Sequence, residues 1–266
     1  MLRPDLGYFG PDSVTWRIHG AASTFIGGMR ALLLQALHPR AMAGVDQFSD
    51  FRDHPWRRLL RTIDYVLVTT YGTTAQADEA AERVRNMHRR VRGIDPVTGK
   101  PYAAGDHDLL LWVHAVEIDS YLEAFLVYGS DLTSSDADRY VAERVRSVEA
   151  LGLPPGRAPS SVDELKDYLT SMESELVLSD ASRGVRSLVM RSPVPRPFNV
   201  PLMLPGAAAA VTLPTRARAI YGLHWPAPVD LAVRLAGRTA CATLGPLVPD
   251  APIVRSAKRR ARTRAA

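Results

Sequence analysis

The stretch that decides the fold is Asp108–Tyr128, with the sequence DLLLWVHAVEIDSYLEAFLVY. A helix of this sequence is apolar over most of its circumference, and such a helix is expected in the interior of a fold. Asp106 stands just before it and is able to cap its first turn. We therefore predict a central helix over residues 108–128, with other helices packed around it.

The segments on both sides also have helical periodicity. Predicted helices cover residues 21–37, 39–45, 56–70, 74–92, 134–151, 161–178, 202–211, 214–223 and 228–244, and a proline-rich break falls at 192–197. No long window alternates with the period of two that strands require. The sequence predicts an all-α, single-domain helical bundle over residues 21–250, with an N-terminal extension at 1–20 and a basic, disordered tail at 251–266.

Composition narrows the class of protein. Of the 266 residues, 46% are hydrophobic and 23% are charged, which is usual for a globular domain. The single cysteine, Cys241, excludes an intramolecular disulfide and cysteine-rich zinc or iron-sulfur sites, and the missing Cys-x-x-Cys-His motif excludes covalently attached c-type haem. The sequence has no apolar leader and no stretch suited to spanning a bilayer, so we expect a cytoplasmic protein.

Positive charge is concentrated near the end of the sequence. The net charge is +5, and Arg255–Arg264 carries six positive charges and no negative ones. A short basic run without interleaved aromatic residues is typical of a solvated extension, so we expect no specific nucleic-acid partner. Peripheral membrane contact through Arg255–Arg264 stays an open alternative.

His88 is the first candidate for metal chemistry. It lies in the apolar stripe of the predicted helix 74–92, four residues after Val84, so we expect it to face inward. Arg92 follows one turn later on the same face. A neutral imidazole is the commonest protein ligand of transition metals, and an arginine beside it suits a carboxylate. The alternative is a core histidine that is hydrogen-bonded to a backbone carbonyl.

Four polar side chains share a face of the preceding helix at spacings of three and four. Two arginines beside a hydroxyl can bind carboxylates such as haem propionates, or place a donor over bound dioxygen. The same pattern also describes an ordinary solvated helix face. The four residues are Arg58, Arg61, Thr62 and Tyr65.

Two further histidines occupy positions where burial is expected. His38 precedes Pro39 at a helix end, where it is either a distal group of a binding site or a helix cap. His114 lies in the central helix, where it could contact a cofactor or pair with Glu117 or Asp119 as a structural residue.

Most familiar catalytic motifs are absent from the sequence. It has no Glu-x-x-His, His-Glu-x-x-His, facial triad, nucleophile elbow, Walker loop or dinucleotide fingerprint. A single histidine ligand remains compatible with haem, because the porphyrin supplies the other four equatorial donors.

Four segments, in this order, resemble an oxygenase family. They are GGMRALLLQALHPRAMAGV at 27–45, RLLRT at 58–62, VRNMHRRVRG at 84–93, and GKPYAA at 99–104 followed by LLWVHA at 110–115. The chain is similar over roughly residues 15–230 to the family that includes the fungal MpaB-type enzymes and the bacterial rubber oxygenase called latex clearing protein.

The resemblance implies an all-helical, globin-like core that binds b-type haem, with His88 as the proximal axial ligand in a Met-His-x-x-x-Arg setting. It also implies a distal side at residues 58–62, where Arg61 replaces a lysine that caps the iron in the rubber oxygenase branch. A guanidinium stays protonated and is a poor iron ligand. A resting state capped by Arg61 is therefore not expected, and rubber cleavage itself is not implied.

Together these observations predict a haem b oxidoreductase that uses dioxygen to oxidise a small apolar molecule, which the resemblance makes unsaturated or prenyl-like. The alternatives are a haem-dependent dehydrogenase or peroxidase, a non-catalytic haem- or gas-binding protein, and a helical lipid carrier. The expected residues are His88 on the iron, Arg58, Arg92, Tyr65 and His114 around the cofactor, and Arg61, Thr62 and His38 as catalytic groups.

Overall fold

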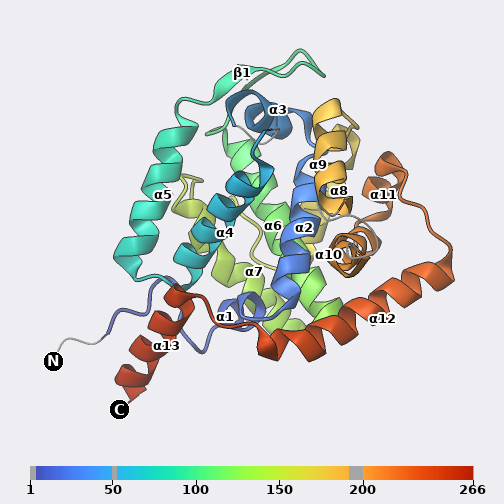
Figure 1. Cartoon of the computed structure of the whole chain (residues 1–266). Helices are drawn as coiled ribbons and strands as arrows, with labels where there is room; N and C mark the ends of the chain where they lie inside the picture. Colours follow the sequence, from blue (N-terminus) through green and yellow to red (C-terminus); the bar gives the residue numbers. More distant parts are fainter. Residues whose placement is uncertain (1–3, 50–52, 192–199, 266) are drawn as a thin grey trace.

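The computed structural model describes residues 4–49, 53–191 and 200–265, and these ranges are almost entirely helical (Figure 1). The helices are α1 (Val14–His19), α2 (Ser23–Gln35), α3 (Pro39–Phe48), α4 (Pro55–Tyr71), α5 (Thr74–His88), α6 (His107–Tyr128), α7 (Ser134–Glu149), α8 (Val162–Ser171), α9 (Asp180–Met190), α10 (Val200–Val211), α11 (Thr215–Tyr221), α12 (Ala227–Leu244) and α13 (Pro252–Ala265). Short 3-10 turns, η1 (Glu173–Glu175) and η2 (Gly245–Leu247), and two strands, β1 (Arg92–Ile94) and β2 (Pro101–Ala103), complete the described elements.

The predicted central helix is confirmed as α6, which lies behind α2 and α4 in Figure 1. It packs most closely against α2, and also against α7, α8 and α12. The contact with α2 requires a glycine, because a Cβ atom on Gly27 would stand 2.8 Å from the ring of Tyr121. Asp106 is the N-cap residue of α6, although its carboxylate accepts from the Ala103 amide rather than from the helix.

The main hydrophobic core lies where α2 and α6 meet α9, α10 and α11. The alanines Ala208, Ala209 and Ala210 are fully buried, which lets α10 approach its neighbours closely. Two tyrosine hydroxyls tie this layer to backbone carbonyls, Tyr128 to Ala208 at 2.8 Å and Tyr221 to Leu33 at 2.7 Å. The all-α fold expected from the sequence is therefore confirmed.

The segment after α5 differs from the prediction. The helix predicted to reach Arg92 ends at His88, and Arg92 instead begins a small antiparallel hairpin in which Gly93 lies opposite Tyr102. Gly93 fits there because a Cβ atom would stand 2.8 Å from the side-chain oxygen of Gln47. The prediction that Arg92 extends the helical face of His88 is thus wrong.

Two other segments also differ. Helix α9 was not predicted, and it begins with a capping box between Ser179 and Ser182. The predicted helix 161–178 is shorter, ending at Ser171 before η1. The proline-rich break at 192–197 lies outside the described residues.

The segment predicted as a disordered tail is helix α13. Val254 and Ala257 are buried in a cluster with Phe9, Trp16 and Tyr71, so the helix has an apolar side that packs on the body. Arg260 donates from Nη2 to the carbonyl of Tyr71 at 2.6 Å. The basic composition concealed this short apolar stripe.

Candidate active site

Helices α4 and α5 form an antiparallel hairpin (Figure 1). Thr73 closes its turn with a capping box, in which the Thr73 hydroxyl accepts from the Gln76 amide at 3.3 Å and the Gln76 side chain accepts from the Thr73 amide at 2.9 Å. The antiparallel arrangement brings the start of α4 level with the end of α5. Arg58 and His88 therefore lie at the same end of the hairpin.

A shallow groove follows the line where the two helices meet. Its volume is about 190 Å³, which is below the ~300–1,000 Å³ usual for ligand pockets. Arg61, Tyr65 and Val68 line it from α4, and Ala80, Val84 and Met87 line it from α5. The groove confirms the antiparallel pairing of the two helices, but it is too small to be the binding site itself.

His88 is half-buried as the last residue of α5, and burial lowers the pKa of its imidazole. Among the described residues the imidazole has no hydrogen bond and no ion pair. The lowered pKa favours the neutral ring, which is the form that binds metals. His88 thus has the protonation state and the free nitrogen that an axial ligand needs.

Arg58 is also half-buried, and burial lowers the pKa of its guanidinium. No carboxylate or carbonyl within the described part of the chain accepts a hydrogen bond from it. A desolvated cation without a partner is unfavourable, and an anionic ligand group would relieve that cost. The same end of the hairpin therefore presents an unpartnered imidazole and an unpartnered guanidinium.

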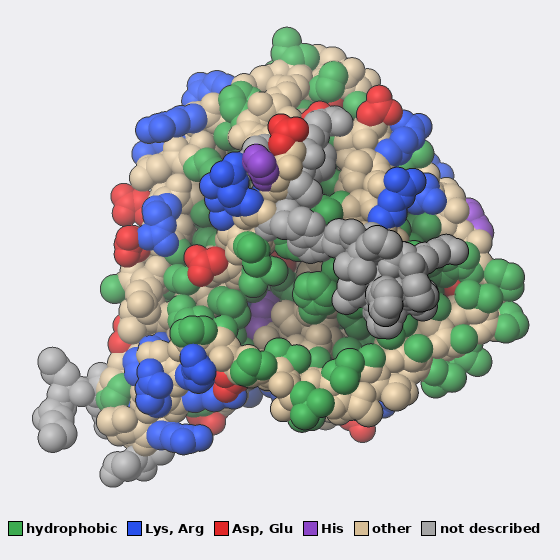
Figure 2. Space-filling model, in the orientation of Figure 1, with side chains coloured by type: hydrophobic (Ala, Val, Ile, Leu, Met, Phe, Trp, Pro, Cys, Tyr) green, Lys and Arg blue, Asp and Glu red, His purple; other side chains and the backbone are tan. Residues whose placement is uncertain are grey.

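The backbone of the hairpin lies away from the central helices, although Val66 of α4 belongs to the same apolar cluster as Ile118 and Leu122 of α6. It packs closely on α1 and α13 but makes almost no close backbone contact with α2 or α6. Figure 2 shows a hollow bordered by hydrophobic side chains on the face where α4, α2 and α12 meet, with a histidine side chain visible inside it. We call the space between the hairpin and α2 and α6 the slot.

The wall of α2 that the other helices leave uncovered is apolar. Phe25, Met29 and Leu32 follow one another at helical spacing, and all three are exposed or half-buried. Gln35 continues this face and donates to the carbonyl of Val113 on α6 at 3.1 Å. An apolar wall of this kind suits an apolar ligand.

Unpartnered polar atoms occupy the interior beside this wall. The Tyr65 hydroxyl on α4 and the His114 Nε2 atom on α6 are buried and have no hydrogen-bond partner in the described structure. On α7, the Nε and Nη1 atoms of Arg144 are also buried without a hydrogen-bond partner among the described residues. The Nη2 atom donates to Glu117 at 2.9 Å. Buried polar atoms nearly always have partners, so water or a polar ligand group is expected here.

The charges of this cluster follow from burial. Burial and, to a smaller extent, the nearby Arg144 charge lower the pKa of His114 to about 3, so the ring is neutral. Burial raises the pKa of Glu117, whereas the Arg144 charge and hydrogen bond oppose that rise. Burial also raises the pKa of Tyr65. The pKa of the Glu117 carboxyl group is therefore raised above its ordinary value despite the Arg144 charge.

The remaining predicted residues lie elsewhere. Arg61 and Thr62 are exposed, and the Thr62 hydroxyl donates to the Arg58 carbonyl at 3.2 Å. Arg92 is exposed on β1, and its Nη2 atom donates to the Arg89 carbonyl at 2.7 Å. His38 is fully buried as the N-cap of α3, where its Nδ1 atom accepts from the Ala41 amide at 3.3 Å.

Sequence reasoning missed Arg144 and assigned Glu117 the wrong partner. Glu117 pairs with Arg144, and Asp119 pairs with Arg30 at 2.7 Å, so neither carboxylate bonds to His114. The signal for Arg144 was its place between Tyr140 and Val148 on the buried face of α7. An arginine within such a stripe indicates a buried ion pair or a ligand.

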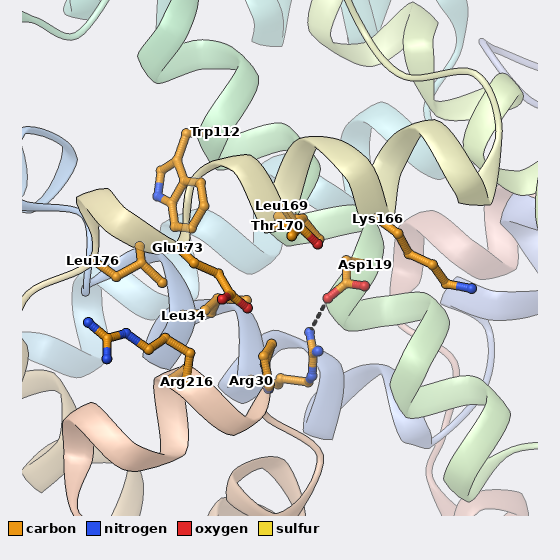
Figure 3. Close-up of a pocket in the computed structure, with 12 residues that line it drawn as sticks. Arg30, Leu34, Trp112, Asp119, Lys166, Leu169, Thr170, Glu173, Leu176 and Arg216 are labelled. Atoms are coloured by element: carbon orange, nitrogen blue, oxygen red, sulfur yellow. Dashed lines mark hydrogen bonds and ion pairs between the residues drawn. The ribbon is translucent and has the colours of Figure 1, made fainter.

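A second pocket lies between α2, α6, α8 and α11, away from the hairpin (Figure 3). Its volume is about 170 Å³. Arg30 is its buried cation, and the Arg30 guanidinium binds Asp119 and Ser120 at 2.7 Å and the Thr212 carbonyl at 3.0 Å. The buried cation of this pocket thus has a carboxylate partner, whereas Arg58 has none among the described residues.

The chain is an all-helical domain with unpartnered polar atoms in its interior, and the comparisons give its family. Residues 16–242 match the family described as "ER-bound oxygenase mpaB/B'/Rubber oxygenase, catalytic domain", so the chain belongs to this family of oxygenase catalytic domains. The family expected from the sequence is confirmed. No curated protein and no solved structure matches the chain.

Two further tests apply to the described residues. They contain no group of three or more His, Cys, Asp or Glu side chains that could hold a metal ion. Within the same ranges, none of the helices combines the length and the apolar character needed to cross a bilayer.

Proposed function

We propose that the slot binds b-type haem, with the His88 imidazole as the axial ligand of the iron. The supporting observation is that the imidazole is neutral, desolvated and unpartnered at the end of α5. Arg58, at the same end of the hairpin, would pair with a propionate, which removes the cost of its desolvated charge. When bound, haem supplies the iron at which dioxygen is activated for oxidation of the substrate.

The substrate that fits this proposal is a small apolar molecule, unsaturated or prenyl-like as in the chemistry of the family. The apolar face of α2 would hold such a molecule and exclude water from it. Arg61 and Thr62 are exposed on α4 of the same hairpin as His88, so we propose them for the rim of the site on that side and not for the face opposite His88. We assign no catalytic role to His38, whose ring nitrogen already caps α3, and none to Arg92.

Glu117 would serve the reaction as a proton store. Its carboxyl oxygen is held by Arg144 at 2.9 Å, and burial raises its pKa, which favours uptake of a proton relative to an exposed carboxyl group. The unpartnered His114 Nε2 and Tyr65 hydroxyl would hold water between this carboxyl group and the substrate. These residues supply the polar end of an otherwise apolar site.

The optical spectrum of the purified protein after titration with haemin tests the cofactor. We expect a stoichiometric Soret band for the unmodified protein, a weaker and shifted band for His88→Ala, and lower haem affinity for Arg58→Ala. His224→Ala is the matched control, because His224 is exposed in the loop before α12. Absence of a Soret band in the unmodified protein, or an identical band in His88→Ala and His224→Ala, would refute the proposal.

A further inference from the structure

Helix α12 carries its apolar side chains outward, which is the reverse of an ordinary surface helix. Leu231 and Leu235 are each 58% exposed, and they lie four residues apart on one face. Pro228 and Ala242 continue this outward face, whereas Gly237 is buried on the opposite side against Tyr128. The outward face of α12 is thus largely apolar, with the exposed Arg238 between Leu235 and Ala242.

Large apolar residues are also exposed where the helix ends, at Leu244, which lies two turns after Gly237 on the side opposite Leu235, and in the turn that follows. Leu244, Leu247 and Val248 are 59%, 76% and 68% exposed, which is unusual for three large apolar residues so close in sequence. In Figure 2, hydrophobic side chains line the lower edge of the molecule along α12. We call these five residues the α12 ridge: Leu231, Leu235, Leu244, Leu247 and Val248.

Helix α13 follows the ridge directly in the chain and carries the opposite kind of surface. Its apolar side packs on the body through Val254 and Ala257, which turns its basic side chains to solvent. The helix has no acidic residue, and within the described residues Lys258 forms an ion pair with Asp250 at 2.7 Å. We call the exposed cations the α13 basic face: Arg255, Lys258, Arg259, Arg262 and Arg264.

We propose that the α12 ridge and the α13 basic face together dock the protein on an anionic phospholipid surface. The ridge would enter the boundary between headgroups and acyl chains, and the basic face would contact the phosphate groups. Charge complementarity selects this partner, because an apolar protein surface or a second copy of the chain would not supply anionic groups for the five cations. Nucleic acid would use the cations and leave the ridge exposed to water.

The position of the slot gives the docking surface a purpose. The hollow lies directly above α12 in Figure 2, so a bilayer held against the ridge would lie close to its mouth. An apolar substrate dissolved in the bilayer could then reach the slot without crossing much water. This purpose rests on the proposed function, whereas the docking surface itself does not depend on haem.

Co-sedimentation of the full chain with vesicles tests the docking surface. We expect binding to vesicles of phosphatidylcholine with about one third phosphatidylglycerol, little binding to pure phosphatidylcholine, and weaker binding as salt increases. The variant Arg255→Glu/Arg259→Glu/Arg262→Glu should bind roughly 100-fold more weakly, because each basic residue near an anionic surface contributes a few-fold to the affinity and reversal adds repulsion. Circular dichroism would verify that each variant is folded.

Two matched control variants show whether vesicle binding depends on where the basic and apolar residues lie or only on how many there are. Lys100→Glu/Arg157→Glu/Arg183→Glu makes the same change of charge outside α13 and should bind more tightly than the α13 variant. Leu235→Ser/Leu247→Ser should weaken binding at least about tenfold at constant charge, whereas Ile94→Ser/Val97→Ser, which removes exposed apolar residues from the β-hairpin, should not.

Four results would overturn the proposal. They are absence of binding to the anionic vesicles at low salt, equal binding by the two charge variants, a dimer in solution that Leu235→Ser/Leu247→Ser converts to a monomer, and binding to a short DNA duplex but not to vesicles. Failure here would leave the Soret band of the unmodified protein unchanged. The docking surface and the haem site can therefore fail independently.

Discussion

The Arg144 guanidinium donates from Nη2 to Glu117 Oε1 at 2.9 Å, while its Nε and Nη1 atoms are buried without a hydrogen-bond partner. Its face also packs over the ring of Phe9, with the guanidinium carbon 5.5 Å from the ring centroid. One carboxylate and one aromatic ring satisfy a buried guanidinium only in part. This pair connects α6 with α7 and leaves two buried nitrogen atoms of Arg144 without a partner among the described residues.

Removing one partner of this pair should be costly. Arg144→Met leaves the Glu117 carboxyl group without its cation, and we expect the free energy of unfolding to fall by about 3 kcal/mol. The double variant Arg144→Met/Glu117→Leu should recover part of that loss, because no unpaired charge remains. Urea denaturation measures both values. Equal stability of Arg144→Met and the unmodified protein would show that the pair is not buried as described.

Acid should destabilise the protein through its buried histidines. Burial lowers the pKa of His114 to about 3 and that of His38 to about 4, from 6.5 in the unfolded chain. Because each folded pKa is depressed, the stabilisation is complete above pH 6.5 and is lost as the pH falls towards these values. At pH 5 each histidine should account for a loss of roughly 2 kcal/mol.

The variant His114→Gln separates this effect from other titrations. We expect its unfolding free energy to fall less between pH 7 and pH 5 than that of the unmodified protein, by roughly 2 kcal/mol. Urea denaturation at both pH values gives the comparison. If the two proteins lost the same free energy, His114 would not be buried in its neutral form.

His38 distinguishes a structural role from a catalytic one. Its ring caps α3 and packs against Trp112 with ring centroids 5.5 Å apart. We expect His38→Ala to lower the free energy of unfolding by about 1–2 kcal/mol through the lost cap, with no shift of the Soret band. Thermal unfolding and the optical spectrum of the haem-loaded protein check this. A shifted band with unchanged stability would favour a distal role instead.

Two adjacent glycines of α2 provide a matched test of the α2–α6 contact. A Cβ atom on Gly27 would stand 2.8 Å from the Tyr121 ring, whereas one on Gly28 would meet only the Tyr121 hydroxyl, at 3.8 Å. Gly27→Ala should destabilise by about 1–3 kcal/mol through overpacking, and Gly28→Ala should be neutral or stabilise by up to about 1 kcal/mol. A reversed order of stabilities would contradict the described packing of these helices.

The sequence alone predicted the helices that have strong apolar periodicity or clear end signals. The bounds of α6 were within one residue because its apolar run is bordered by Asp106 and Gly129. Prediction failed where tertiary contacts decide the backbone. Arg92 continues a helical pattern in sequence, but strand pairing with Ala103 takes it out of the helix.

The candidate site was predictable one residue at a time, but not as an arrangement. Spacing placed Arg58 and His88 on helices, and only the antiparallel hairpin shows that they lie at one end. The sequence did not single out Arg144, because the partner of a buried charged residue depends on which helices pack against each other. The packing of α7 against α6 is a tertiary contact that the sequence does not reveal. The basic tail was predicted to be disordered because its six cations dominate its composition. The structure shows that two apolar residues, Val254 and Ala257, pack it against the body of the protein.

The most direct test of the account is chemical rescue of the axial ligand. His88→Gly removes the imidazole side chain, and free imidazole added with haem should restore the Soret band of the unmodified protein in a saturable way. His224→Gly treated identically should show the unmodified spectrum without imidazole. If His88→Gly bound haem with an unaltered spectrum before imidazole is added, His88 would not be the ligand, and the proposed site would be wrong.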